Sequence, residues 1–264
     1  MMPKRSTHKG SSSSRHKLLP KELLGQVKKE IANATRQLES FLAVQSYFAG
    51  GPLLGDMHGW PISPDFALYL IELLEFNDYD LVIEFGSGTS TVLIARTLAK
   101  IAPRRQGKQA TVQVAFEHLE LFHGQTLARL QQAGLAHAVQ LVHAPLQPYA
   151  AANGNRYDYY ACQNALTESA QGTQPAGLRV LVLVDGPPAA TGKHARYPAL
   201  PVVLAQFAGA QLDILLDDYI REDEKEIAQL WLSDLQQAGY APTLVEKKLE
   251  KDACLISVNT AAHP

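Results

Sequence analysis

The chain has 264 residues and a net charge of −2, so it is long enough for one large α/β domain with a terminal extension. This near-neutral balance gives no reason to expect a nucleic acid as a partner. Cys162 and Cys254 stand alone, which excludes a metal-ligand spacing or a disulfide framework and suits a reducing compartment. No apolar run approaches the ~20 residues of a membrane span. We therefore expect a cytoplasmic protein.

Residues 1–18 are polar and basic and include a run of four serines. They cannot bury a core, so we expect a disordered tail. Residues 19–50 are predicted to form one helix, because apolar side chains recur at spacings of three and four along it: Leu24, Val27, Ile31, Ala34, Leu38 and Phe41. Such a stripe favours a homo-oligomer through helix 20–48. The alternative is packing on the protein's own domain or on another protein.

Residues 51–264 are expected to form the main domain. It begins with a loop that holds Asp56, His58 and Trp60. Trp60 either lines a pocket or packs in the core. Ser63 and Pro64 then suit the start of a helix that is apolar enough to cover a sheet.

The stretch from Leu81 to Thr91 organises the rest of the domain. Its first five residues, 81–85, are mostly apolar and are expected to form a strand covered on both faces. Gly86 and Gly88, with Ser87 between them, allow a sharp turn and a close approach to a ligand. A helix is predicted over residues 90–100. A strand, glycine loop and helix in this order indicate a small-molecule site at the strand's carboxyl end.

Glu84 indicates what kind of ligand the loop binds. The dinucleotide fingerprint G-x-G-x-x-G is incomplete, since Thr91 replaces its third glycine. The Glu84 carboxylate would also repel a pyrophosphate, whereas it would attract a ligand that carries an ammonium and a sulfonium. The pattern E-x-G-x-G resembles the first motif of class I S-adenosylmethionine (SAM)-dependent methyltransferases, with Ser90 in place of a third glycine.

The resemblance covers residues 60–260 and implies a methyltransferase whose cofactor is SAM. It implies a doubly wound, mostly parallel seven-stranded α/β sheet with a terminal antiparallel hairpin, preceded here by the N-terminal helix. Glu84 and Glu117 would hold the methionyl and ribose parts, and Gly86, Ser87 and Gly88 would form the loop. Glu117 follows a predicted strand over 110–116, and its alternative role is to cap the next helix.

Further strands are predicted from apolar and alternating runs. Their ranges are 138–143, 180–184, 212–216, 243–249 and 253–258. Between the first two of these strands, residues 146–178 are the least regular part of the chain. Their tyrosine cluster either covers the acceptor pocket or covers the core.

Acidic residues follow two of these strands. Asp185 and Asp218 would lie at neighbouring strand ends, where carboxylates suit Mg²⁺. Acids after the equivalent strands bind metal in catechol-type and some sugar O-methyltransferases, to which the chain is similar. Tyr219 stands where the catechol type has an Asn ligand, and Asp217 is a substitute. Alternatively, Asp185 binds SAM or stabilises the turn that follows it, and Asp217 and Asp218 cap the next helix.

His194 is the best candidate base for a reaction without metal, because it follows Asp185 closely and histidine titrates near neutral pH. Lys193 and Arg196 beside it would suit an anionic acceptor. A solvated basic loop is the alternative.

The sequence thus favours O-methylation of a small molecule or sugar. A non-catalytic SAM- or nucleoside-binding assembly module is the first alternative. An NAD-dependent oxidoreductase is the second, and Glu84 argues against it.

Overall fold

The structure is a computed structural model that describes residues 20–49, 62–105, 107, 109–171 and 174–259. The predicted disordered tail over 1–18 lies outside the described residues, as do Asp56, His58 and Trp60. Among the helices that are described, none combines the length and the apolar character needed to cross a lipid bilayer.

The first helix, α1 (Pro20–Tyr47), crosses the boundary between two compact units, residues 1–36 and 37–264. In the second unit, the last turns of α1 pack on α2 (Pro64–Phe76). Gln37 Nε2 donates a hydrogen bond of 2.7 Å to Asp65 Oδ2, and Val44 is fully buried. This part of the predicted helix therefore belongs to the main domain.

A mostly parallel sheet of seven strands, in the order β3-β2-β1-β6-β7-β9-β8, forms the centre of the domain. The strands are β1 (Leu81–Phe85), β2 (Val112–Glu117), β3 (Val139–His143), β6 (Arg179–Val184), β7 (Gln211–Leu216), β8 (Ala241–Lys247) and β9 (Ala253–Asn259). In this sheet, β9 is antiparallel to its two neighbours, β7 and β8, and the other neighbouring strands are parallel to each other. The predicted doubly wound sheet and its terminal hairpin are confirmed.

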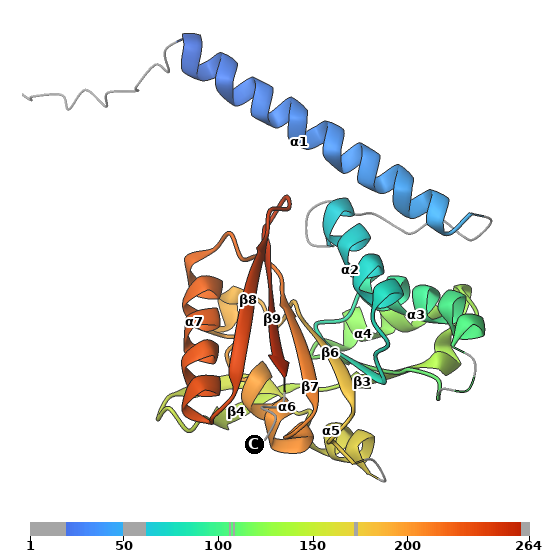
Figure 1. The fold of residues 1–264 in the computed structure, drawn as a ribbon, viewed down its shortest axis with the longest axis vertical. Coiled ribbons are helices and arrows are strands. Elements are labelled where there is room, and N and C mark those ends of the chain that lie inside the picture. The colour runs from blue at the N-terminus through green and yellow to red at the C-terminus, as the bar shows by residue number, and fades with distance from the viewer. Residues whose placement is uncertain (1–19, 50–61, 106, 108, 172–173, 260–264) are drawn as a thin grey trace, which may run out of the picture. The chain divides into compact units, whose positions relative to one another are not determined.

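Helices cover both faces of the sheet (Figure 1). α2 and α3 (Thr89–Ile101) pack on one face with Val82 and Leu181, whereas α6 (Ala199–Phe207) and α7 (Glu222–Gln237) pack on the other with Ile83 and Val182. Successive residues of one strand thus enter opposite cores, which explains why the central strands are mostly apolar. The remaining helices are α4 (Glu120–Gln132) and α5 (Gln163–Ala170).

The stretch that looked least regular contains a second, two-stranded sheet, β4 (Leu146–Ala150) and β5 (Arg156–Tyr160), followed by α5. Its tyrosines are largely buried: Tyr159 and Tyr160 are at most 1 % exposed, and both pack against Phe85. The hairpin therefore lies against the end of β1.

Candidate functional site

The site lies at the carboxyl ends of β2, β1, β6 and β7, which are neighbours in this order. The order in which strands are added to the sheet changes direction between β1 and β6, because β2 and β3 lie on one side of β1 and the later strands on the other. Open α/β sheets bind ligands at such a point. Glu84, Glu117, Asp185 and Asp217 each lie at or directly beyond the end of one of these strands.

Gly86 allows two strand ends to approach closely. Its φ of +98° lies in the left-handed region, and a Cβ atom there would meet the backbone nitrogen of Gly186 at 3.1 Å. Any larger residue would be strained and would push β1 away from the turn after β6. Gly88 differs, since nothing lies within 4 Å of its Cβ direction. The space beside Gly88 is open to a ligand.

Glu84 is completely buried. Its Oε1 atom accepts a short hydrogen bond from the Ser90 hydroxyl, whereas its Oε2 atom has no hydrogen-bond partner among the described residues. Burial raises the pKa of Glu84 to about 8, and the charges of Asp185 and Glu117 add to this effect against the hydrogen bonds from Ser90 and Thr91. Among the residues that the structure describes, the carboxyl group therefore has no positive partner.

Glu117 is also buried, and its two oxygens have different neighbours. Oε1 accepts a hydrogen bond of 2.9 Å from the backbone of Leu119, directly before α4, as expected of a helix cap. Oε2 lies 3.4 Å from the Ser87 hydroxyl of the glycine loop. The structure thus brings Glu117 and Ser87 together, while one oxygen supports the alternative capping role.

Asp185 and Asp217 end neighbouring parallel strands in matched register, since Val184 pairs with Leu216. Asp218 follows with a φ of +59° and donates its backbone N–H to Asp217 Oδ1 over 2.7 Å. One oxygen of each of the three carboxylates lies within 4.8 Å of the others. Asp217, rather than Asp218, is therefore the register partner of Asp185.

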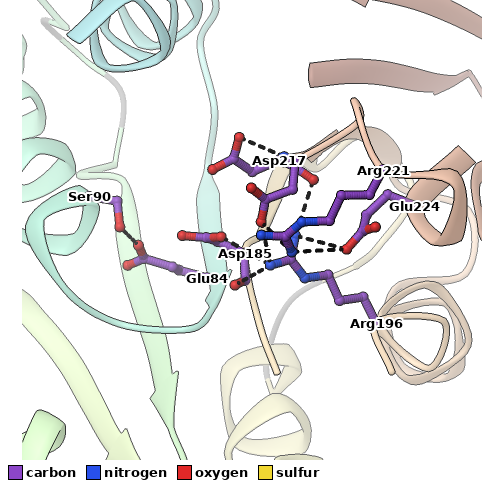
Figure 2. A network of polar contacts seen from close by, with 8 residues as sticks. Glu84, Ser90, Asp185, Arg196, Asp217, Arg221 and Glu224 are labelled. Atoms are coloured by element: carbon purple, nitrogen blue, oxygen red, sulfur yellow. Dashed lines mark hydrogen bonds and ion pairs between the residues drawn. The ribbon is translucent and has the colours of Figure 1, made fainter. Parts of the chain in front are cut away.

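Arg196 lies within an acidic cluster, which we define as Asp185, Asp217, Asp218 and Glu224 (Figure 2). Its guanidinium is buried, with Nη2 2.9 Å from Asp218 Oδ2 and 3.3 Å from Asp185 Oδ1. A second guanidinium, that of Arg221, lies 2.9 Å from the same Asp218 oxygen. The sequence placed Arg196 toward an acceptor, whereas the structure directs it inward.

Acidic side chains outnumber the guanidiniums in this cluster, four to two. Burial raises the pKa of Asp185 to about 6, with Arg196 acting against it and Asp218 adding to it. Burial raises the pKa of Asp217 as well, and the charges of Asp185 and Asp218 add to this effect against Arg196. The three carboxyl groups of Asp185, Asp217 and Asp218 bring oxygen atoms together, as a hard divalent cation requires, and such a cation would favour their ionised forms.

His194 lies apart from these groups and faces α7. Its backbone N–H donates to Asp223 Oδ2 over 2.7 Å, and its Nε2 atom lies 2.7 Å from Glu226 Oε2. Lys193 pairs with the same glutamate at 2.9 Å. The structure therefore brings Arg196 and Asp185 together in the site, whereas the His194 ring contacts α7 instead.

No protein-family model and no curated protein matches the chain. Solved structures are similar to it, among them the following two. A proposed O-methyltransferase from Klebsiella pneumoniae is 17% identical over 85% of this chain and 89% of its own, with a TM-score of 0.51. The SAH-bound methyltransferase PaMTH1 from Podospora anserina is 12% identical over 90% of this chain and 96% of its own, also with a TM-score of 0.51. The chain thus has the Rossmann-like fold of class I methyltransferases.

Proposed function

We propose that the protein is a SAM-dependent methyltransferase that methylates an oxygen atom of a small molecule or sugar. The observation that carries this proposal is the buried carboxyl group of Glu84, whose Oε2 atom has no partner among the described residues. An apolar neighbour would leave this oxygen unsatisfied, whereas an ammonium would supply both a hydrogen bond and a positive charge. The methionyl end of SAM carries such an ammonium.

The neighbouring residues fit the other parts of SAM. Glu117, one strand away, has an oxygen that faces Ser87 across 3.4 Å and would accept the ribose hydroxyls instead. The open space beside Gly88 would admit the ligand against the backbone. A pyrophosphate does not fit as well, because Glu117 and Asp185 would repel it. This argues against the NAD alternative.

When bound, SAM supplies a methyl group on a sulfonium. This methyl group is activated because the sulfonium leaves readily as a neutral thioether. The protein has to orient the acceptor and remove its hydroxyl proton. In a reaction without metal, we assign the proton to the carboxylate of Asp185, because this group is partly buried and its pKa of about 6 suits a base near neutral pH. His194 would first have to leave Glu226 and Asp223.

We further propose that Asp185 and Asp217 hold Mg²⁺, with Asp218 as a third ligand. Asp218 is the weaker donor, since two guanidiniums already share its Oδ2 atom. A cation there would balance the excess charge of the acidic cluster and lower the pKa of a coordinated acceptor hydroxyl. The description of the Klebsiella protein as an O-methyltransferase supports oxygen as the acceptor atom.

The reaction is tested by incubating the protein with methyl-labelled SAM and a panel of catechols, phenols and sugars, with Mg²⁺ or with EDTA. Label transfer that is lost with Asp185→Asn and retained with His194→Gln supports the assignment of the base. Loss with His194→Gln alone would contradict it. Binding of SAM without transfer to any acceptor would favour the non-catalytic assembly module.

A further inference from the structure

The helix α1 exposes a continuous apolar stripe. The residues of this stripe are 45 to 61 % exposed: Leu23, Leu24, Val27, Ile31, Leu38 and Leu42. From Leu24 to Leu42 they follow the three- and four-residue spacing of one helix face, with the exposed Ala34 between Ile31 and Leu38. Isolated exposed leucines are ordinary, but a stripe of this length marks an interaction site.

The stripe is distinct from the face of α1 that packs on the main domain. Gln37, Ser40 and Val44 form that second face and are buried. At 100° per residue the two faces are separated by roughly 100–160° around the helix. The sequence pattern placed Phe41 on the stripe, whereas the structure packs Phe41 against the domain core and leaves Leu42 exposed. Within the second unit, packing of α1 on the domain therefore leaves Leu38 and Leu42 uncovered.

The helix needs a partner for energetic reasons. Residues 20–36 belong to a compact unit separate from the main domain, and a single helix without tertiary packing is marginal in water. If each stripe side chain exposes roughly 100 Å², the stripe offers about 600 Å² per chain, close to the ~800 Å² per partner of a standard protein interface. The stripe is thus large enough to support a dimer.

The charges of α1 favour a protein partner over a lipid surface. Along the helix, the basic residues Lys21, Lys28, Lys29 and Arg36 are nearly balanced by Glu22, Glu30 and Glu39. Helices that lie on anionic membranes carry a polar face rich in Lys and Arg instead. Mixed charges beside a three-four apolar repeat are typical of a coiled coil. We propose that α1 pairs through this stripe with α1 of a second copy of the chain, forming a homodimer.

The test is sedimentation equilibrium of the full chain at micromolar concentrations. We expect twice the chain mass for the native protein, and the chain mass for Leu24→Gln/Ile31→Gln/Leu38→Gln, with a dissociation constant raised at least about tenfold because three apolar contacts are lost. The matched control, Lys29→Gln/Ala32→Gln, changes the opposite side of α1 and should remain dimeric. Circular dichroism melting of the main domain should be the same in all three proteins.

A native chain that sediments at the mass of one chain would overturn the proposal, as would a dimer that persists in the triple variant. Vesicles of phosphatidylcholine and phosphatidylserine provide the second measurement. Co-sedimentation of a monomeric native chain, lost in the triple variant, would assign the stripe to a membrane surface instead. Because the test does not depend on SAM, its failure leaves the proposed methyl transfer untouched.

Discussion

Arg196 and Asp218 form a buried ion pair, with Nη2 of the guanidinium 2.9 Å from Oδ2 of the carboxylate. The same guanidinium donates to the main-chain carbonyls of Asp185 and Asp217 at 2.9 and 3.1 Å. One cation therefore joins the ends of β6 and β7 and offsets part of the negative charge between them. The spacing of the proposed base and metal ligands depends on this contact.

Replacing Arg196 should destabilise the fold strongly. Arg196→Leu leaves the four carboxylates with Arg221 as their remaining partner, so we expect a loss of about 3–5 kcal/mol in the free energy of unfolding. Arg221→Leu is the control: its side chain is 46% exposed, so its loss should stay within about 1 kcal/mol. Urea denaturation measures both. Equal losses in the two variants would mean that burial of the Arg196 pair is energetically unimportant.

The two glycines of the loop should respond differently to substitution by alanine. Gly86→Ala meets backbone at 3.1 Å from a left-handed conformation, so we expect a loss of about 1–3 kcal/mol. Gly88→Ala meets open space; we expect a stability change within about 1 kcal/mol and a weaker affinity for SAM. Thermal melting and calorimetry separate the two effects. If Gly88→Ala binds SAM as the native chain does, the ligand does not approach this glycine.

The titration of Glu84 gives the protein a characteristic pH dependence. Its pKa of about 8 in the folded chain is above the ordinary glutamate value of 4.5, so folding stabilises the protonated form. This stabilisation is fully present below the unfolded pKa and is lost as the pH rises through the folded pKa. We expect the free energy of unfolding to fall between roughly pH 4.5 and 8 by a few kcal/mol through this group.

Glu84→Gln should flatten that fall, because the amide does not titrate. The control Glu75→Gln, on α2, should keep the native slope. Denaturant titrations at pH 5, 6, 7 and 8 measure the three proteins. Parallel curves for the native chain and Glu84→Gln would show that Glu84 does not carry this proton.

Mg²⁺ should stabilise the native protein. A cation that binds the folded chain alone raises its midpoint of thermal unfolding in proportion to RT ln(1 + [L]/Kd). We expect an increase with millimolar Mg²⁺ that EDTA reverses and that Asp217→Asn removes. Asp223→Asn, on α7, should retain it. An equal response of Asp217→Asn and the native chain would place any bound Mg²⁺ elsewhere.

Local pattern was sufficient to predict the sheet. The runs at 81–85 and 180–184 are almost entirely apolar, with Glu84 as the exception, because both faces of β1 and β6 are covered, and periodicity detects this directly. The β4–β5 hairpin was missed, since its strands alternate imperfectly and Pro148 interrupts β4. Pairing between such strands depends on the sheet against which they pack.

The sequence was sufficient to predict which strand ends carry the site, but not which side chains contact one another there. Glu84 and Glu117 follow from their places beside apolar strands. The inward direction of Arg196, the register of Asp185 with Asp217 and the attachment of His194 to α7 depend on tertiary packing. Sequence distance gives no signal for them: Arg196 and Asp218 are 22 residues apart. The acid-rich start of α7 was the one available hint that the basic loop has an internal partner.

The central claim is that Glu84 receives the ammonium group of SAM, and calorimetric titration of the purified chain tests it most directly. We predict binding of SAM and S-adenosylhomocysteine in the micromolar range, no binding of NADH, and an affinity for SAM lowered at least about tenfold by Glu84→Gln. Glu75→Gln should bind as the native chain does. Failure of the folded native chain to bind SAM, or unchanged affinity in Glu84→Gln, would contradict the claim.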